Sequence, residues 1–287
     1  MNLDLLRFSP GAYLAPVVDW LNKNFHPFFS AVVTLIEAVL GAIEGVLLYP
    51  PAYALILAAI LIAFIFVGLR VAVITAIALL FCLFSGLWAA SMQTLALVTV
   101  AVSIAVLVAF PMGIMASRHR GLESALRPLL DIMQTVPPWV YLIPAVMIFS
   151  LGRVPAIIAT VIYGIPPMLR LTTLAFKQVP KEFKELGQAT GASPRFILFK
   201  IEIPLATPTL LVGLNQCILL SLAMVVLAGL VGAGGLGAEV TRGLTRMEMG
   251  LGLRAGLSIV AIAILLDRFS KGALQRHPRT AHGFQIK

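Results

Sequence analysis

The sequence has few charged residues and few cysteines. Asp, Glu, Lys and Arg make up 11% of its 287 residues, against roughly 25% in soluble domains, which excludes an ordinary soluble protein. Cys82 and Cys217 both fall inside apolar runs, where free thiols behave as small hydrophobes, and neither a disulfide framework nor a metal site is predicted. The four histidines are scattered without ligand spacing, so we expect no metal ion.

The signatures of several enzyme classes are also missing. The chain contains no G-x4-G-K-[ST], H-E-x-x-H or G-x-S-x-G motif. The segment Gly232-Ala-Gly-Gly-Leu-Gly237 fits G-x-G-x-x-G, but it follows a long apolar run instead of a strand, so we expect a tight turn and no dinucleotide site. The chain is therefore predicted to be no enzyme and to hold no cofactor.

Acidic residues are fewer than basic ones, which gives a net charge of +9. No basic stripe is interleaved with aromatic residues, so nucleic acid is not predicted as a partner. Most of the 21 Lys and Arg residues instead lie between apolar runs on one side of the predicted membrane topology. The positive-inside rule puts that side in the cytoplasm, with the amino terminus outside and the carboxyl terminus inside.

Apolar residues are abundant, at 60% of the chain, and several runs approach the ~20 residues that cross a hydrocarbon core of ~30 Å. We expect an all-α polytopic membrane protein with about seven transmembrane helices in contact with lipid. The last predicted span, Leu251 to Leu266, is the weakest because Arg254 interrupts it. The spans are Ala52 to Gly68, Val71 to Trp88, Met92 to Ala116, Val136 to Gly152, Val154 to Phe176, Leu205 to Val231 and Leu251 to Leu266.

The first fifty residues are predicted to form an extracytoplasmic tail. Met1 to Asp4 lacks the basic region of a signal peptide, so we expect this tail to be retained. Ala31 to Leu48 is apolar except for Glu37 and Glu44, which share one helical face, and it is predicted to lie at the membrane interface. The alternative is an additional span. Beyond it we expect accessory transmembrane helices (51–91), a main transmembrane domain (92–272) and a cytoplasmic tail (273–287).

A charged loop at residues 177–204 separates two predicted spans. Pro180 suits a first helical position, and Gly191 suits the left-handed residue that ends a helix. Ser193-Pro194 is typical of an N-cap followed by proline, and Pro204 is predicted to end the second helix. The loop is therefore predicted to contain two short helices outside the membrane.

The spacing Glu185-Leu-Gly187, three residues, Gly191-Ala192, then Ile201-Glu-Ile-Pro204 resembles the EAA motif of permease subunits of ABC importers. Leu186-Gly187 replaces two alanines, and Ile203 replaces leucine. The resemblance implies a MetI-like transmembrane domain of a type I importer. It also implies that the loop couples to an ATPase. The residues expected to do so are Glu185, Gly187, Gly191, Ala192, Ile201 and Pro204.

Further segments resemble the glycine betaine/proline betaine permease branch of that family. They include Leu129 to Pro144, Gly164 to Thr172, Gly213 to Gln216 and Asp267-Arg268. The branch implies a permease homodimer in a bacterial inner membrane, two ATPase subunits that bind ATP and Mg²⁺, and a substrate-binding protein. The imported solute would be a quaternary amine used in osmoprotection.

Polar residues near or inside the spans are candidates for contact with substrate or partner. Asn215 and Gln216 lie in the middle of a span and are predicted to line the pathway or, alternatively, to bond between helices. Arg242, Arg246 and Arg254, on the outer side, are candidates for docking the binding protein, and the alternative is a solvated loop. An ion-coupled secondary transporter is the alternative function, but the sequence shows no inverted repeat.

Overall fold

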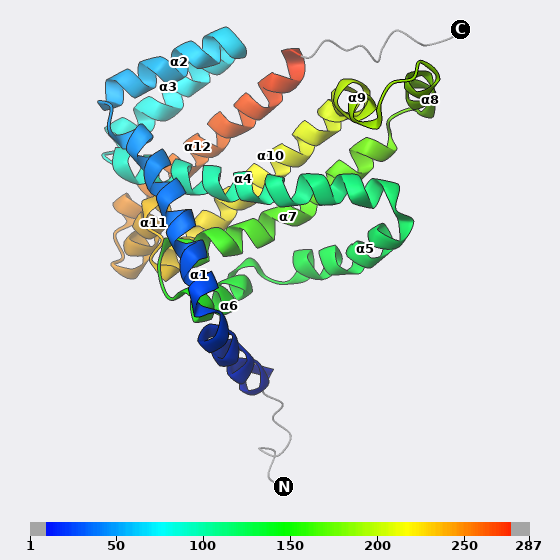
Figure 1. Ribbon diagram of the computed structural model, residues 1–287. Coiled ribbons are helices and arrows are strands. Elements are labelled where there is room, and N and C mark those ends of the chain that lie inside the picture. Colours follow the sequence, from blue (N-terminus) through cyan, green and yellow to red (C-terminus); the bar gives the residue numbers. More distant parts are fainter. Residues whose placement is uncertain (1–9, 277–287) are drawn as a thin grey trace.

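The computed structural model describes residues 10–276, and the regular elements of that part are all helical (Figure 1). The elements in chain order are α1 (Pro10–Leu48), α2 (Ala52–Phe66), α3 (Leu69–Phe84), α4 (Trp88–Arg118), α5 (Arg120–Thr135), η2 (Pro138–Tyr141), α6 (Leu142–Phe149), α7 (Arg153–Lys177), α8 (Lys181–Ala189), α9 (Pro194–Ile197), η3 (Leu198–Glu202), α10 (Ile203–Ala228), η4 (Gly229–Val231), α11 (Gly235–Thr245) and α12 (Met249–Arg276).

Four of the predicted spans are confirmed as long apolar helices. They correspond to α4, α7, the continuous segment Pro194–Val231 and the segment Met249–Gly272 of α12. The first two predicted spans form the hairpin of α2 and α3, whose 15 and 16 residues extend for only about 22 to 24 Å. These two helices are shorter than the ~30 Å hydrocarbon core, and the sequence predicted about seven transmembrane helices in all. The described residues contain five helices long enough to cross, or up to six.

The predicted span Val136 to Gly152 is not a membrane-length helix, because its helical part, Pro138–Phe149, is too short and passes as a span only together with α5. α5 and the helical segment Pro138–Phe149 are bent by 106° at the break between them. Val136 precedes a proline and is extended, with φ −67° and ψ 129°, since a proline ring disfavours the helical conformation of the residue before it. The charged segment before this break, Arg120–Thr135, forms the amphipathic helix α5, which was not predicted from the sequence.

The core of the molecule lies where α4, α7, α10 and α12 pack together. On α4, Ala101, Ala105 and Ala109 recur every fourth residue and have no exposed surface. Small residues at this spacing let helix backbones approach closely, as is common between membrane helices. A Cβ on Gly113 would lie 2.6 Å from the Cβ of Thr172, so α4 and α7 are in close contact near their carboxyl ends.

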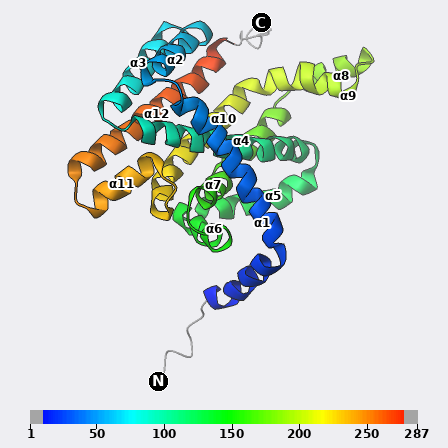
Figure 2. The same cartoon turned by 60° about the vertical axis from the view of Figure 1, so that its left-hand side comes forward.

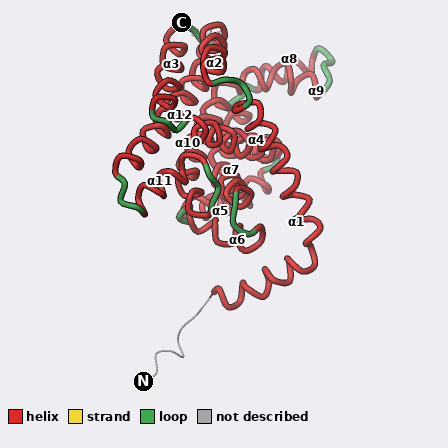
Figure 3. Tube along the Cα trace, turned by 90° about the vertical axis from the view of Figure 1, so that its left-hand side faces the viewer, coloured by secondary structure: helices red, strands yellow, loops and turns green. Residues whose placement is uncertain are grey.

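The amino-terminal helix α1 lies across the bundle instead of running alongside it. Figures 1, 2 and 3 show α1 crossing α4 and extending away from the other helices towards its amino end. It is longer than the predicted helix Ala31 to Leu48 and bends at Phe25, two residues before Pro27. Glu44 pairs with Arg153 at 2.8 Å. Pro16–Leu48 is also long and apolar enough to span, so its placement at the interface stays a prediction.

The two termini bear on several sequence predictions. Residues 1–9, on which the absence of a signal peptide was argued, lie outside the described residues. The predicted cytoplasmic tail begins at residue 273, but α12 continues to Arg276, and 277–287 lie outside the described part of the chain.

Candidate coupling loop and helix-bundle cavity

The loop between α7 and α10 projects from one end of the bundle (Figures 1 and 2). Its first helix, α8, ends in two nested hydrogen bonds. The amide of Gly191 donates to the carbonyl of Gln188, and the amide of Ala192 donates to the carbonyl of Gly187. Gly191 has φ 73°, the left-handed conformation that glycine adopts at low cost. This is the Schellman arrangement, which satisfies carbonyls at a helix end. The predicted helix end at Gly191 is therefore confirmed.

The second half of the loop begins at the predicted cap and then departs from the prediction. The Ser193 hydroxyl accepts a bond from the Phe196 amide at 3.3 Å, with Pro194 in the first helical turn. The predicted helix end at Pro204 is wrong, because the helix continues into α10. A π-helical turn, η3, comes just before Pro204, and its wider spacing relieves the clash of the proline ring with the carbonyl four residues earlier.

The two halves of the loop pack against each other through Gly187. A Cβ at this position would lie 3.0 Å from Ile197 and from Ile201, so a larger residue would push these side chains away from α8. Glu185, on the other hand, is exposed. Around it the loop also exposes apolar side chains, which at a protruding tip favour contact with another protein. These are Phe183, Leu186, Phe196 and Phe199, with 46 to 63% of their surface exposed.

The same loop contains a buried carboxylate that was not predicted from the sequence. Glu202, in η3, is 5% exposed and pairs with Arg118 of α4 and Lys184 of α8, each at 2.8 Å. A signal was available, because an acid placed between Ile201 and Ile203 in an apolar run requires a cationic partner when it is buried. The sequence alone does not say which cations these are.

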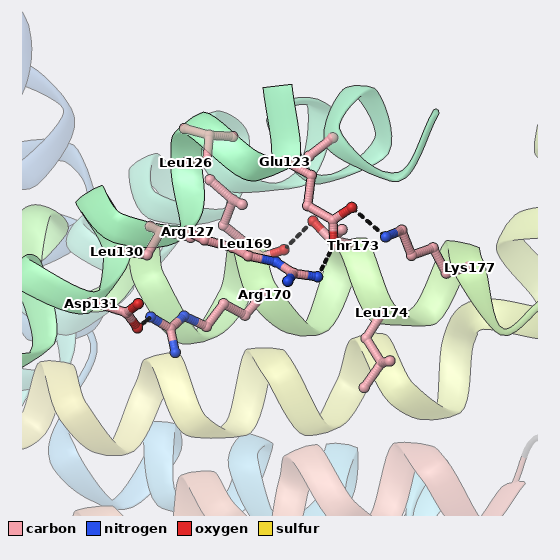
Figure 4. Close-up of a pocket in the computed structure, with 11 residues that line it drawn as sticks. Glu123, Leu126, Arg127, Leu130, Asp131, Leu169, Arg170, Thr173, Leu174 and Lys177 are labelled. Atoms are coloured by element: carbon pink, nitrogen blue, oxygen red, sulfur yellow. Dashed lines mark hydrogen bonds and ion pairs between the residues drawn. The ribbon is translucent and has the colours of Figure 1, made fainter. Parts of the chain in front are cut away.

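A second site lies between α5 and α7, beside the loop. It is a cavity of about 360 Å³, and side chains cross it from both helices (Figure 4). Lys177 of α7 contacts Glu123 of α5, and Arg127 donates to the same carboxylate at 2.7 Å. Arg170 of α7 pairs with Asp131 of α5 at 2.5 Å. These ion pairs hold α5 against α7 across the cavity.

The candidate pathway residues do not line this cavity. Asn215 is buried, and its amide donates to Asp267 of α12 at 3.1 Å, which is the interhelical bond that the sequence left as the alternative. Asp267 also pairs with Lys271 at 2.8 Å. Gln216 faces outward from α10 and is exposed.

The three candidate docking arginines have different surroundings. Arg242 pairs with Glu239 within α11 at 3.0 Å, and Arg246 is exposed at the end of that helix. Arg254 donates to the carbonyl oxygen of Ser85 at 3.2 Å and so joins α12 to the end of α3. The structure thus brings Arg242 and Arg246 together on one element and places Arg254 on another.

The glycine-rich segment forms the tight turn that the sequence predicted. Gly232, Gly234 and Gly235 have φ of 82°, 78° and 65°. The turn is bound to α4, because the Thr94 hydroxyl accepts from the Leu236 amide at 2.8 Å. It is also bound to the start of α7, since the Gly152 amide donates to Val231 at 2.9 Å. These hydrogen bonds fix the turn against the neighbouring helices at the bundle end opposite the loop.

Comparisons with known proteins agree with this architecture. Residues 105–276 match the family described as binding-protein-dependent transport system inner membrane component. The chain therefore belongs to this family and is a multi-pass membrane permease.

Particular relatives carry glycine betaine in their names. The chain is 41% identical over 254 residues to the glycine betaine/proline betaine transport system permease protein ProW of Escherichia coli, covering 88% of this chain and 72% of that one. It is 40% identical to the glycine betaine transport system permease protein OpuAB of Bacillus subtilis, covering 88% and 90%. It is 35% identical to the glycine betaine/carnitine permease protein GbuB of Listeria monocytogenes, covering 91% and 96%.

Among solved structures, the chain is similar to one from the MetNI methionine ABC transporter in an inward-facing conformation. The TM-score is 0.55 at 21% identity, with 65% of this chain and 93% of that chain covered. At this identity the likeness shows the fold, which is the MetI-like importer fold predicted from the sequence.

Proposed function

We propose that this chain is the membrane-spanning subunit of an ATP-driven importer of glycine betaine or a related quaternary amine. The observation that carries the proposal is the protruding loop of α8, α9 and η3, with its ordered turn at Gly191 and its exposed face around Glu185. The names of the relatives support the substrate class. ATP and Mg²⁺ are bound by a separate ATPase, and the chain works as a homodimer with two copies of that ATPase.

The loop is the surface that meets the ATPase. Its protruding tip offers an acid, Glu185, within a patch of exposed apolar side chains, whereas Gly187, Ala192, Ile201 and Pro204 shape the loop behind it. ATP closes the ATPase dimer, the loop moves with its docking groove, and the helices carry that displacement to the pathway. To switch the permease almost completely between two conformations, ATP must favour one of them by roughly 5.5 kcal/mol.

The opposite end of the bundle receives the substrate-binding protein. The end of α11 exposes Arg246 beside Leu244, Met247 and Met249, and these three apolar side chains are 74 to 93% exposed. A cationic and apolar turn suits a partner with acidic residues at its rim. This assignment requires the amino terminus outside and the carboxyl terminus in the cytoplasm, which the distribution of Lys and Arg supports.

Substitution of Glu185 by lysine tests the proposal. Because Glu185 is exposed, Glu185→Lys leaves folding and membrane insertion intact while ATP hydrolysis no longer drives uptake. The assay is glycine betaine uptake and ATP hydrolysis in proteoliposomes that hold permease, ATPase and binding protein. Glu37→Gln in α1 is the control, since it changes an acid far from the loop. Normal uptake by Glu185→Lys would overturn the assignment of the loop.

An ion-coupled secondary transporter is the competing function. It needs a titratable acid in the transport path, and Asp267 is the candidate at the depth of Asn215. Asp267 is already paired with Lys271, which supplies a fixed counter-charge in place of a transported ion. This function is therefore less well supported than the ATP-driven importer. Uptake that survives ATP depletion and stops with an ionophore would favour it.

A further inference from the structure

The carboxylate of Glu202 joins three separate elements at the loop end of the bundle. One oxygen, Oε1, pairs with Lys184 of α8, and the other, Oε2, accepts from Arg118 at the end of α4. Glu202 itself belongs to η3, which leads directly into α10. A single side chain therefore connects the protruding helix with two of the long helices.

The connection is rigid because the carboxylate is buried. The Glu202 side chain is 6% exposed, whereas those of Arg118 and Lys184 are 49% and 31% exposed. A buried carboxylate that loses one of its cationic partners is less well compensated, which is more costly than breaking a surface pair. α8 therefore does not shift away from α4 or η3 without a strong penalty.

The local backbone adds to this arrangement. In η3 the Ile203 amide bonds to the Leu198 carbonyl, five residues back, instead of the usual four. π-helical turns of this kind often occur at functional sites. Gly187 of α8 packs on Ile197 and Ile201, so the apolar contact and the ion pairs hold α8 on the same segment.

We propose that Glu202 is a positioning residue that makes α8, the end of α4 and the start of α10 move as one body when the ATPase pulls on the loop. This rests on the proposed function of the chain as an importer subunit. The Arg118 pair carries the displacement of α8 into α4, and the continuous helix carries it into α10. Glu185 meets the ATPase, and Glu202 passes the movement on.

The test compares Glu202→Gln with the wild type in proteoliposomes containing permease, ATPase and binding protein. The measurement is the amount of glycine betaine imported per ATP hydrolysed, together with co-purification of the ATPase. Glutamine keeps the shape and removes the charge, so the ATPase still docks and hydrolyses ATP while the import ratio falls several-fold. Glu44→Gln is the matched control, because it breaks a 2.8 Å pair with Arg153 and leaves the ratio unchanged.

Three further variants separate positioning from stability. Arg118→Gln and Lys184→Gln each remove one half of the link, and each lowers the import ratio. The double variant Glu202→Gln/Lys184→Met also removes the Lys184 ammonium, which has lost its partner in Glu202→Gln. Its yield of folded complex is higher than that of Glu202→Gln alone, but its import ratio stays low. Recovery of the ratio together with the yield would overturn the proposal, as would an unchanged ratio in Glu202→Gln.

The result for the wild type distinguishes this inference from the proposed function. If the wild-type complex imports no solute on ATP hydrolysis, the function itself is wrong. If the wild type is coupled and Glu202→Gln is equally coupled, only the role of Glu202 is wrong.

Discussion

Gly191 holds the end of α8 in a conformation that suits glycine. Its φ of 73° costs an L-residue roughly 1–2 kcal/mol. Gly191→Ala should therefore raise the open population of the loop about 5- to 30-fold. Limited proteolysis of the loop in the purified complex measures this, because the cleavage rate follows the open population.

Gly121→Ala is the matched control for that substitution. Gly121 lies in the first turn of α5, and a Cβ there would meet no atom within 4 Å. Alanine is favoured over glycine in a helix, so α5 tolerates this change. Because Gly121 lies outside the loop, the variant leaves the cleavage rate of the loop unchanged. Equal cleavage of the two variants would show that Gly191 does not hold the loop closed.

Asn215 is expected to act through the helix packing and not through the substrate. Asn215→Leu removes the hydrogen bond to Asp267, and interhelical bonds of this kind contribute roughly 0.6 to 2 kcal/mol. The thermal stability of the purified complex should fall, whereas the KM for import stays constant. Gln216→Leu, at an exposed position, leaves the stability unchanged. A raised KM in Asn215→Leu would indicate contact with the solute instead.

At the scale of elements, the loop shows which features the sequence can predict. Its turn at Gly191 and its cap at Ser193 depend on residues next to them in the chain, so local chemistry was sufficient. The continuation through Pro204 depends on η3, whose π-helical turn has no comparable local signature. The network around Glu202 spans 84 residues between Arg118 and its carboxylate, and such distant pairs are set by packing.

α5 and the 106° bend after it are two further features that local sequence patterns did not predict. The sequence placed α5 between two predicted spans and assigned it no structure. In the structure, Glu123 and Arg127 of α5 pair one turn apart, and its charged side faces Lys177 and Arg170 of α7. The hydrophobic pattern detects apolar spans better than it detects a charged helix over a cavity. Pro137 and Pro138 indicate an interruption of the helix in the sequence, but the direction in which the chain continues after them depends on tertiary contacts.

The cavity between α5 and α7 is expected to be open to water from the cytoplasmic side. Leu174 lines it and is 44% exposed, so Leu174→Cys should react with a membrane-impermeant maleimide added at that side. The native Cys82 and Cys217 have no exposed surface and should give no background. Ala159→Cys, fully buried in α7, is the control and should stay unlabelled. Labelling of Leu174→Cys only from the outside would reverse the proposed orientation.

The crossing of α1 over α4 gives a test of its place at the membrane surface. In an interfacial helix, Asp19→Cys and Val46→Cys both react with an impermeant maleimide added outside, because the two exposed positions lie on one side of the membrane. In a spanning helix they lie on opposite sides. Labelling of Asp19→Cys from the cytoplasm alone would make α1 an additional span.

At the scale of the whole molecule, the two ends of the bundle differ. The glycine-rich turn at one end is held by hydrogen bonds to α4 and to the start of α7, whereas the end with the loop of α8 and α9 has a cavity crossed by ion pairs. An end that opens on a signal from outside the chain needs elements that move together, and the contacts of Glu202 and Gly187 provide them. In the proposed function, the energy for this movement comes from a separate ATPase.

The central claim is that this chain moves solute only when a separate ATPase acts on its coupling loop. The most direct measurement is glycine betaine accumulation in proteoliposomes containing the permease and its binding protein, with and without the ATPase subunits. We predict uphill accumulation only when the ATPase and ATP are both present. Uphill accumulation without the ATPase, driven by a proton or sodium gradient, would contradict the account.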